Sequence, residues 1–185
     1  RRDELYVDGL NCNPDTFDVE CYECNEHFKK NRSRSEIKSH HYIISFDPRD
    51  KDEHNLTGEK AQTLGLEFVK EHLPGHQALV CTHMDGHNGS GNIHVHIIIN
   101  SLRKLDIEPP PHTTRTIDCK AGYKHHLTKD YLKYLQQELM NLCQRENLYQ
   151  VDLLSPAQSK ITKAEYWLQK RGQKELEDIS EQIIA

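Results

Sequence analysis

Residues 93–100, with the sequence IHVHIIIN, form an apolar run that carries two histidines two positions apart. Such a β-branched run is typical of a buried strand. In an extended chain, residues i and i+2 point to the same face, so His94 and His96 project together while Val95, Ile97 and Ile99 face the opposite way. The sequence therefore predicts a strand with one apolar face and one histidine-bearing face.

The segment before this strand, Gln77 to His83 (QALVCTH), also has the composition of a buried strand and ends in histidine. The glycine-rich stretch between the two segments predicts a hairpin turn. If the hairpin is symmetric about the bond between Asn88 and Gly89, His83 lies opposite His94, with side chains about 5 Å apart. Three imidazoles then gather on one face, which predicts a metal site with open coordination positions, as in catalytic centres.

Two other interpretations compete with this metal site: a chance pairing of histidines, and a zinc site formed by cysteines elsewhere in the chain. Thirteen histidines in 185 residues make chance pairs expected, as at positions 40–41 and 125–126. The third histidine, which the turn argument places independently, favours a ligand set over ordinary hydrogen-bonded histidines. A zinc site at Cys21, Cys24 and His27 is less favoured, because these residues fall inside a predicted helix and no second pair follows.

The bulk composition narrows the class of protein. The length suits one domain with a substantial core, and no apolar run approaches the roughly 20 residues of a membrane span. Six cysteines without a compact disulfide framework predict reduced thiols in a cytoplasmic protein. A net charge of -5 excludes a uniformly basic nucleic-acid binder but not a local basic surface. Because residue 1 is arginine, we expect the N-terminus to be incomplete.

Patterning along the chain predicts an α+β fold, in which an antiparallel sheet has helices packed on one face and the histidine cluster on the other. We expect residues 1–150 to form one domain and residues 151–185 to form a helical extension. The predicted strands cover residues 5–12, 40–46, 77–83 and 93–100, and the predicted helices begin near residues 14, 57, 128 and 162.

The histidine segments resemble those of a known family. Val80-Cys81-Thr82-His83-Met84-Asp85, a glycine-rich gap and then residues 92–101 (NIHVHIIINS) are similar to the motif region of relaxases, the mobilisation nucleases of plasmids and integrative conjugative elements. In these HUH endonucleases two histidines flank one hydrophobic residue, here Val95. The resemblance covers residues 5–150. It implies site- and strand-specific DNA nicking and strand transfer at an origin of transfer, through a tyrosine–DNA covalent intermediate.

The resemblance implies that His83, His94 and His96 bind Mg²⁺ or Mn²⁺, and such a ligand set would also bind Zn²⁺ or Ni²⁺ in vitro. The expected nucleophile is Tyr6, or else a tyrosine upstream of Arg1. A replication initiator of the HUH class would instead carry its tyrosine downstream, on the helix that contains Tyr131 and Tyr134. Further alternatives are a three-histidine metalloenzyme that does not act on DNA, such as a cupin-like oxygenase, and a binding module with a closed zinc site.

The expected partner is single-stranded or hairpin DNA at an origin of transfer, together with other relaxosome proteins and without a membrane. A basic stretch follows the histidine strand, and its cations can neutralise phosphates while its tyrosine stacks on an unpaired base. The residues expected to contact DNA are Arg103, Lys104, Arg115, Lys120, Tyr123, Lys124 and Lys129.

Overall fold

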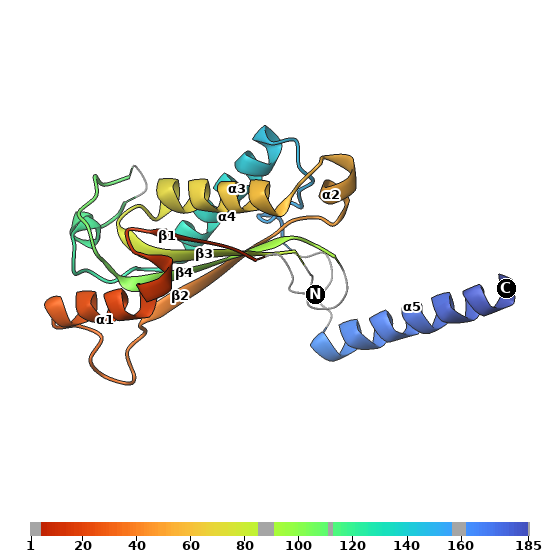
Figure 1. Cartoon of the computed structure of the whole chain (residues 1–185), viewed down its shortest axis with the longest axis horizontal. Coiled ribbons are helices and arrows are strands. Elements are labelled where there is room, and N and C mark those ends of the chain that lie inside the picture. Colours follow the sequence, from red (N-terminus) through yellow and green to blue (C-terminus); the bar gives the residue numbers. More distant parts are fainter. Residues whose placement is uncertain (1–4, 85–90, 111–112, 157–161, 185) are drawn as a thin grey trace. The chain divides into compact units, whose positions relative to one another are not determined.

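The fold is taken from a computed structural model that describes residues 5–84, 91–110, 113–156 and 162–184 (Figure 1). The chain divides into two compact units, residues 1–153 and residues 154–185. The first unit carries every residue of the predicted histidine site. The central part of the predicted turn, residues 85–90, lies outside the described residues.

A four-stranded antiparallel sheet in the order β1-β3-β4-β2 forms the centre of the first unit. The strands are β1 (Leu5–Leu10), β2 (Ser39–Ser45), β3 (His76–His83) and β4 (His94–Arg103). The central pair, β3 and β4, is the hairpin that the sequence predicts, and the predicted α+β class with an antiparallel sheet is confirmed. The edge strand β2 alternates between inward and exposed residues, which is the pattern of a strand with one solvated face.

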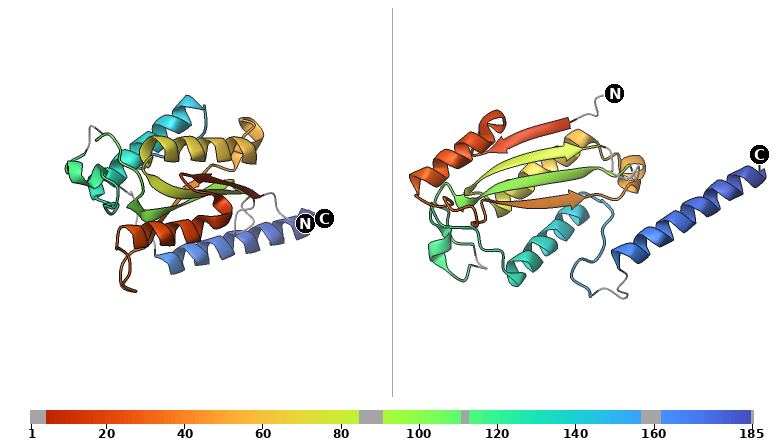
Figure 2. Two further views of the ribbon diagram at one scale, coloured as in Figure 1. Left: turned by 60° about the vertical axis from the view of Figure 1, so that its left-hand side comes forward. Right: turned by 90° about the horizontal axis from the view of Figure 1, so that it is seen from below.

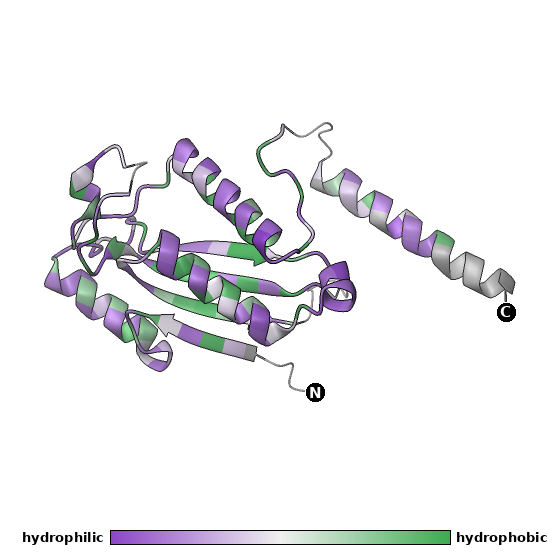
Figure 3. Ribbon diagram, turned by 90° about the horizontal axis from the view of Figure 1, so that it is seen from above, coloured by the Kyte–Doolittle hydropathy of each residue, from purple (hydrophilic) through white to green (hydrophobic). Residues whose placement is uncertain are grey.

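Two long helices, α3 (Gly58–His72) and α4 (Lys129–Arg145), cover one face of the sheet. Each begins at a threonine whose hydroxyl accepts a backbone hydrogen bond: Thr57 from the amide of Lys60, and Thr128 from the amide of Tyr131. Figure 3 shows α3 lying across strands that are largely hydrophobic. Both helices were predicted at these positions from their apolar stripes.

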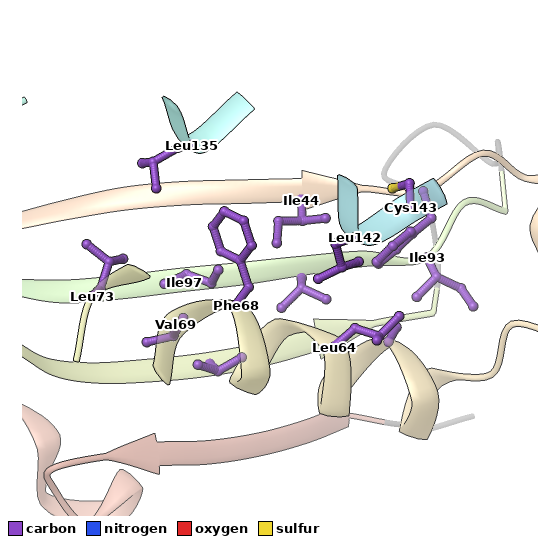
Figure 4. Close-up of a cluster of buried hydrophobic side chains, with 14 of the residues drawn as sticks. Ile44, Leu64, Phe68, Val69, Leu73, Ile93, Ile97, Leu135, Leu142 and Cys143 are labelled. Atoms are coloured by element: carbon purple, nitrogen blue, oxygen red, sulfur yellow. The ribbon is translucent and has the colours of Figure 1, made fainter. Parts of the chain in front are cut away.

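Apolar side chains of β2, β3, β4, α3 and α4 form a common core (Figure 4). Its members include Ile44, Leu64, Phe68, Val69, Val80, Val95, Ile97, Ile99, Leu135 and Leu142. Helix α3 approaches the sheet closely at Gly65, where a Cβ atom would lie 2.6 Å from Cγ1 of Val95. The core therefore takes the apolar face of the histidine strand and leaves the histidines on the other side.

Helix α1 (Phe17–His27) lies on the opposite side of the sheet from α3 (Figures 1 and 2). It follows a short 3-10 helix, η1 (Pro14–Thr16), which Asn13 caps by accepting a hydrogen bond from the amide of Asp15. The expectation that the helices share one face is therefore incomplete, because α1 covers one end of the histidine face. Two short elements were not predicted: α2 (Arg49–Glu53) and the 3-10 helix η2 (Thr116–Cys119).

The cysteines of α1 are packed thiols. Cys24 is buried, and burial raises the pKa of both Cys24 and Cys21, that of Cys21 to about 12. Zinc binds thiolates, so a raised thiol pKa works against the zinc alternative at this helix. Packing of the helix face is the role that their burial supports.

The second unit consists mainly of α5 (Lys163–Ile184). This helix was predicted to begin near Thr162, and it exposes several apolar side chains, including Leu168 and Leu176. No helix in the described part of the chain combines the length and the apolar character needed to cross a membrane.

Candidate metal centre

Three histidines meet at one end of the central hairpin. His83 pairs directly with His94, and Cys81 pairs with His96, in the antiparallel register of β3 and β4. The ring centroids are 5.3 Å apart for His83 and His94, 4.9 Å for His83 and His96, and 5.0 Å for His94 and His96. The register predicted from hairpin symmetry is correct, and it brings three imidazoles into a compact triangle, which we call the histidine triad.

Hydrogen bonds occupy the Nδ1 atoms of two members of the histidine triad. Nδ1 of His96 lies 2.8 Å from Nε2 of His41, and Nδ1 of His94 lies 3.3 Å from the carbonyl oxygen of Asn92. A carbonyl oxygen can only accept a hydrogen bond, so Nδ1 of His94 donates and its Nε2 carries the lone pair. A metal ligand commonly holds its other ring nitrogen in this way.

The electrostatic setting keeps the central ring neutral. Burial, followed by the neighbouring His83, His94 and His41, holds the pKa of His96 below its usual value. Neutral imidazole is the form that binds metal ions. All three rings of the triad are partly exposed, so an ion and its remaining ligands have access to them.

The distances between the three ring centroids suit a shared metal ion. The ring nitrogens, however, do not point toward one common position. Imidazoles that bind one ion through bonds of about 2.1 Å have ring centres roughly 5 Å apart, as in the triad. Among the residues that the structure describes, however, no group of three His, Cys, Asp or Glu side chains has its donor atoms set to hold a metal. Nε2 of His83 lies 3.4 Å from Sγ of Cys81. The pairing of β3 with β4 fixes the backbone positions of the three histidines, whereas rotation of their side chains can turn the ring nitrogens toward a shared ion.

The sheet face beside the triad is open. Ile43 pairs with His96 across β2 and β4, and its side chain is 55% exposed. His41, two residues earlier on β2, is exposed on the same face and stacks on His96 with ring centroids 5.0 Å apart. The sequence interpretation missed His41 because it treated the pair at positions 40 and 41 as a chance occurrence. The alternation of faces along β2 could have shown that His41 points to the face opposite that of His40.

The structure places Tyr6 on the face of the sheet opposite the histidine triad. Tyr6 pairs with Thr82, which lies between Cys81 and His83 and therefore faces the other side of the sheet. A Cβ atom added at Gly58, the first residue of α3, would collide with the Tyr6 ring. The phenol thus packs on the helix-covered face and is not placed to attack a phosphate held by the triad.

The downstream tyrosines also lie on the helix-covered face. The hydroxyl of Tyr131 donates to the carbonyl oxygen of His72 at 3.0 Å, and the hydroxyl of Tyr134 lies 3.0 Å from Nδ1 of the same residue. Burial raises the pKa of Tyr131, so its phenol stays protonated. Neither tyrosine is placed as the replication-initiator alternative requires.

The predicted DNA-contacting stretch begins at the opposite end of β4 from the histidine triad. Arg103 lies nine positions after His94, and this separation corresponds to roughly 30 Å along a strand. Arg103 is half-buried, and its Nε donates to the carbonyl oxygen of Asp118 at 2.9 Å. Its guanidinium packs against the protein, which does not favour the predicted contact with DNA.

Other cations of the same stretch are engaged with protein groups. Lys104 donates to the carbonyl oxygen of Asn11 at 2.6 Å. Ion pairs join Lys120 to Asp106, Lys124 to Glu36 and Arg115 to Asp118, at 2.9, 2.8 and 3.6 Å. The amino group of Lys30 lies over the ring of Tyr123, 4.8 Å from the ring centroid. Lys129 is exposed at the start of α4. Acidic neighbours thus offset much of the positive charge that the sequence suggested.

An antiparallel sheet with a hairpin-borne histidine triad is consistent with a relaxase domain. Residues 1–108 match the family described as "Relaxase: MobA/VirD2-like, nuclease domain". The match covers more than half of the chain, which therefore belongs to this family. The resemblance seen in the sequence is confirmed, and membership argues against the cupin-like and closed-zinc alternatives.

The chain is also similar to two curated proteins. Two proteins named "Protein rlx" from Staphylococcus aureus are each 29% identical to this chain, over 161 and 141 residues. The alignments cover 85% and 76% of this chain, but 41% and 35% of the relatives. The chain thus spans less than half of the length of the relatives it matches. No solved structure matches it.

Proposed function

We propose that this chain is the nuclease domain of a relaxase that nicks one strand of DNA at an origin of transfer and so starts mobilisation of a plasmid or conjugative element. Residues 1–150 form the nuclease domain in this proposal, and residues 151–185 form a helical extension. The observation that carries the proposal is the histidine triad on an open sheet face, in a chain that belongs to the relaxase family.

His83, His94 and His96 are the proposed ligands of one Mg²⁺ or Mn²⁺ ion. When bound, such an ion polarises a phosphate and offsets the charge that builds on its oxygens during nicking. The strands β3 and β4 hold the three histidines side by side, and the hydrogen bond between the rings of His41 and His96 orients the ring of His96. The open face beside Ile43 gives the DNA strand access to this end of the hairpin.

The covalent step requires a tyrosine on the histidine face of the sheet. Its oxygen bonds to phosphorus as the bond to the 3′ oxygen breaks, so the 5′ phosphate stays activated for rejoining. Tyr6, Tyr131 and Tyr134 lie on the other face and do not fill this role in the proposal. A covalent adduct formed with an origin oligonucleotide, digested and analysed by mass spectrometry, identifies the linked tyrosine.

Nicking of supercoiled DNA tests the proposal. Full-length protein with Mn²⁺ and a plasmid that carries the cognate origin should yield open circles with protein attached to the 5′ end. The double variant His94→Ala/His96→Ala should not nick, whereas His126→Ala, which alters an exposed histidine far from the triad, should nick normally. Equal nicking by the double variant and the wild type would exclude the triad from the reaction.

A further inference from the structure

A cavity lies on the histidine face of the sheet, under α1. Its volume is about 370 Å³, and residues of α1, of the segment after it and of β2 and β4 line it. The lining residues that matter here are Tyr22, Asn25, Asn31, Lys38, Ser39 and Asn100. Polar amides and one exposed aromatic ring thus surround a space of the size that binds small ligands.

One buried amide at this cavity has an acceptor without a partner. Asn31 is 4% exposed, and its Nδ2 donates to Oδ1 of Asn25 at 3.1 Å and to Oγ of Ser101 at 2.9 Å. Its Oδ1 is buried and accepts no hydrogen bond from the described residues. Native proteins seldom leave a buried carbonyl oxygen unpaired, so this oxygen calls for a donor that a water molecule or a ligand would supply.

The cavity and the histidine triad share one continuous strip of the sheet. Ser39 of β2 pairs with Asn100 of β4. Ile43 of β2 pairs with His96, which lies four residues before Asn100 in β4. The separation between Asn100 and His96 is roughly 13 Å along the strand. Exposed side chains of β2, including His41 and Ile43, occupy the strip between them. A single polymer lying along β2 and β4 therefore reaches both places.

The carboxylates of Asp18 and Glu26 and the cations of Arg32 and Lys38 line the cavity, and further positive charge lies in the segment that follows α1. The segment between α1 and β2, residues 28–38, carries five basic residues and one acidic residue. Arg34 and Lys38 are exposed, while Arg32 pairs with Glu26 at 2.8 Å and Lys30 lies over Tyr123. A net charge of -5 for the whole chain thus coexists with a local basic rim, which suits a phosphate backbone.

We propose that this cavity binds one unstacked base of single-stranded DNA whose backbone continues along the sheet to the histidine triad. The inference rests on the proposed function and names a part of the substrate that the triad does not contact. Oδ1 of Asn31 accepts a hydrogen bond from an N–H group on the edge of the base, as asparagine amides do in DNA recognition. Tyr22, 66% exposed at the rim, supplies a face for stacking.

Binding of labelled oligonucleotides tests the inference without nicking. The full chain in EDTA is titrated with fluorescein-labelled 20-mers of dA, dC or dT and with an abasic 20-mer that keeps every phosphate. Ser39→Trp fills the cavity from its exposed rim, and Tyr22→Ala removes the stacking ring. Tyr166→Ala on α5 is the matched control for loss of an exposed tyrosine.

We expect Ser39→Trp and Tyr22→Ala to weaken binding of the preferred base-bearing 20-mer about tenfold, as for loss of one base contact. Binding of the abasic 20-mer should not change, and Tyr166→Ala should bind both oligonucleotides as the wild type does. An equal loss on both oligonucleotides, or no loss on either, would overturn the inference. Nicking by the wild type in Mn²⁺, measured separately, shows whether the histidine triad functions even if the cavity does not bind a base.

Discussion

Nε2 of His41 lies 2.8 Å from Nδ1 of His96, and the two rings stack at an interplanar angle of 23°. The contact joins the edge strand β2 to the strand that carries two members of the histidine triad. When His41 accepts a hydrogen bond from Nδ1–H of His96, the lone pair of His96 is confined to Nε2. The neighbouring strand therefore orients the ring of a proposed ligand.

Substitution of His41 should weaken metal binding without removing a ligand. His41→Ala is expected to lower the affinity for Mn²⁺ by about 10- to 100-fold, the usual effect of losing a group that orients a ligand. His41→Gln retains a polar terminus near His96 and should recover part of the affinity. Isothermal titration calorimetry measures both. Unchanged Mn²⁺ affinity in His41→Ala would show that the contact does not position His96.

Tyr6→Phe should retain DNA nicking to within about twofold, because the phenol packs on the face of the sheet opposite the histidines. The assay is the conversion of supercoiled plasmid to open circles in Mn²⁺. A loss of covalent protein–DNA adduct in Tyr6→Phe, with the fold intact by circular dichroism, would restore Tyr6 as the nucleophile.

Gly65 should be required for the close approach of α3 to the sheet. In Gly65→Ala the new Cβ atom would lie 2.6 Å from Val95, and we expect a loss of about 1–3 kcal/mol in the free energy of unfolding. Gly172→Ala in α5 is the matched control, since no heavy atom lies within 4 Å of its new Cβ. That change should be neutral or stabilising by up to about 1 kcal/mol. Urea denaturation compares the two, and equal effects would argue against the packing described for α3.

Acid should destabilise the fold through two buried histidines. Burial, followed by nearby Arg103, lowers the pKa of His76 to about 3, and burial, followed by His76, lowers that of His125 to about 2. The unfolded chain protonates both near pH 6.5, so above that pH they add no pH dependence. Below it, only the unfolded state gains protons until the folded-state pKa values are reached, and stability falls.

The expected loss between pH 6.5 and 5.5 is about 2 kcal/mol for the two histidines together, measured by urea denaturation. His125→Gln should remove roughly half of that slope, because one of the two titrating groups is gone. A free energy of unfolding that is constant from pH 7 to pH 5 would contradict the burial of these rings.

Local patterns in the sequence were sufficient to predict the hairpin and its register. Alternation placed His94 and His96 on one face, and the symmetry of the turn placed His83 opposite His94. Threonine caps and apolar stripes likewise located α3 and α4. Each of these features depends on residues that are close together in the chain, which is why a single sequence reveals them.

Features that depend on long-range pairing were missed. The role of His41 follows from the pairing of β2 with β4, across 55 residues. The face occupied by Tyr6 depends on the pairing of β1 with β3, where a shift of one residue reverses every side chain. The burial of Arg103 depends on a carbonyl oxygen fifteen residues later. Charge and residue type alone could not indicate these partners.

Titration with Mn²⁺ tests the central claim most directly, because it asks whether the three imidazoles hold one ion. By calorimetry, the wild-type chain should bind one Mn²⁺ per molecule, and His94→Ala/His96→Ala should lose that binding while His126→Ala keeps it. Binding of the same stoichiometry and affinity in the double variant would contradict a metal centre at the histidine triad.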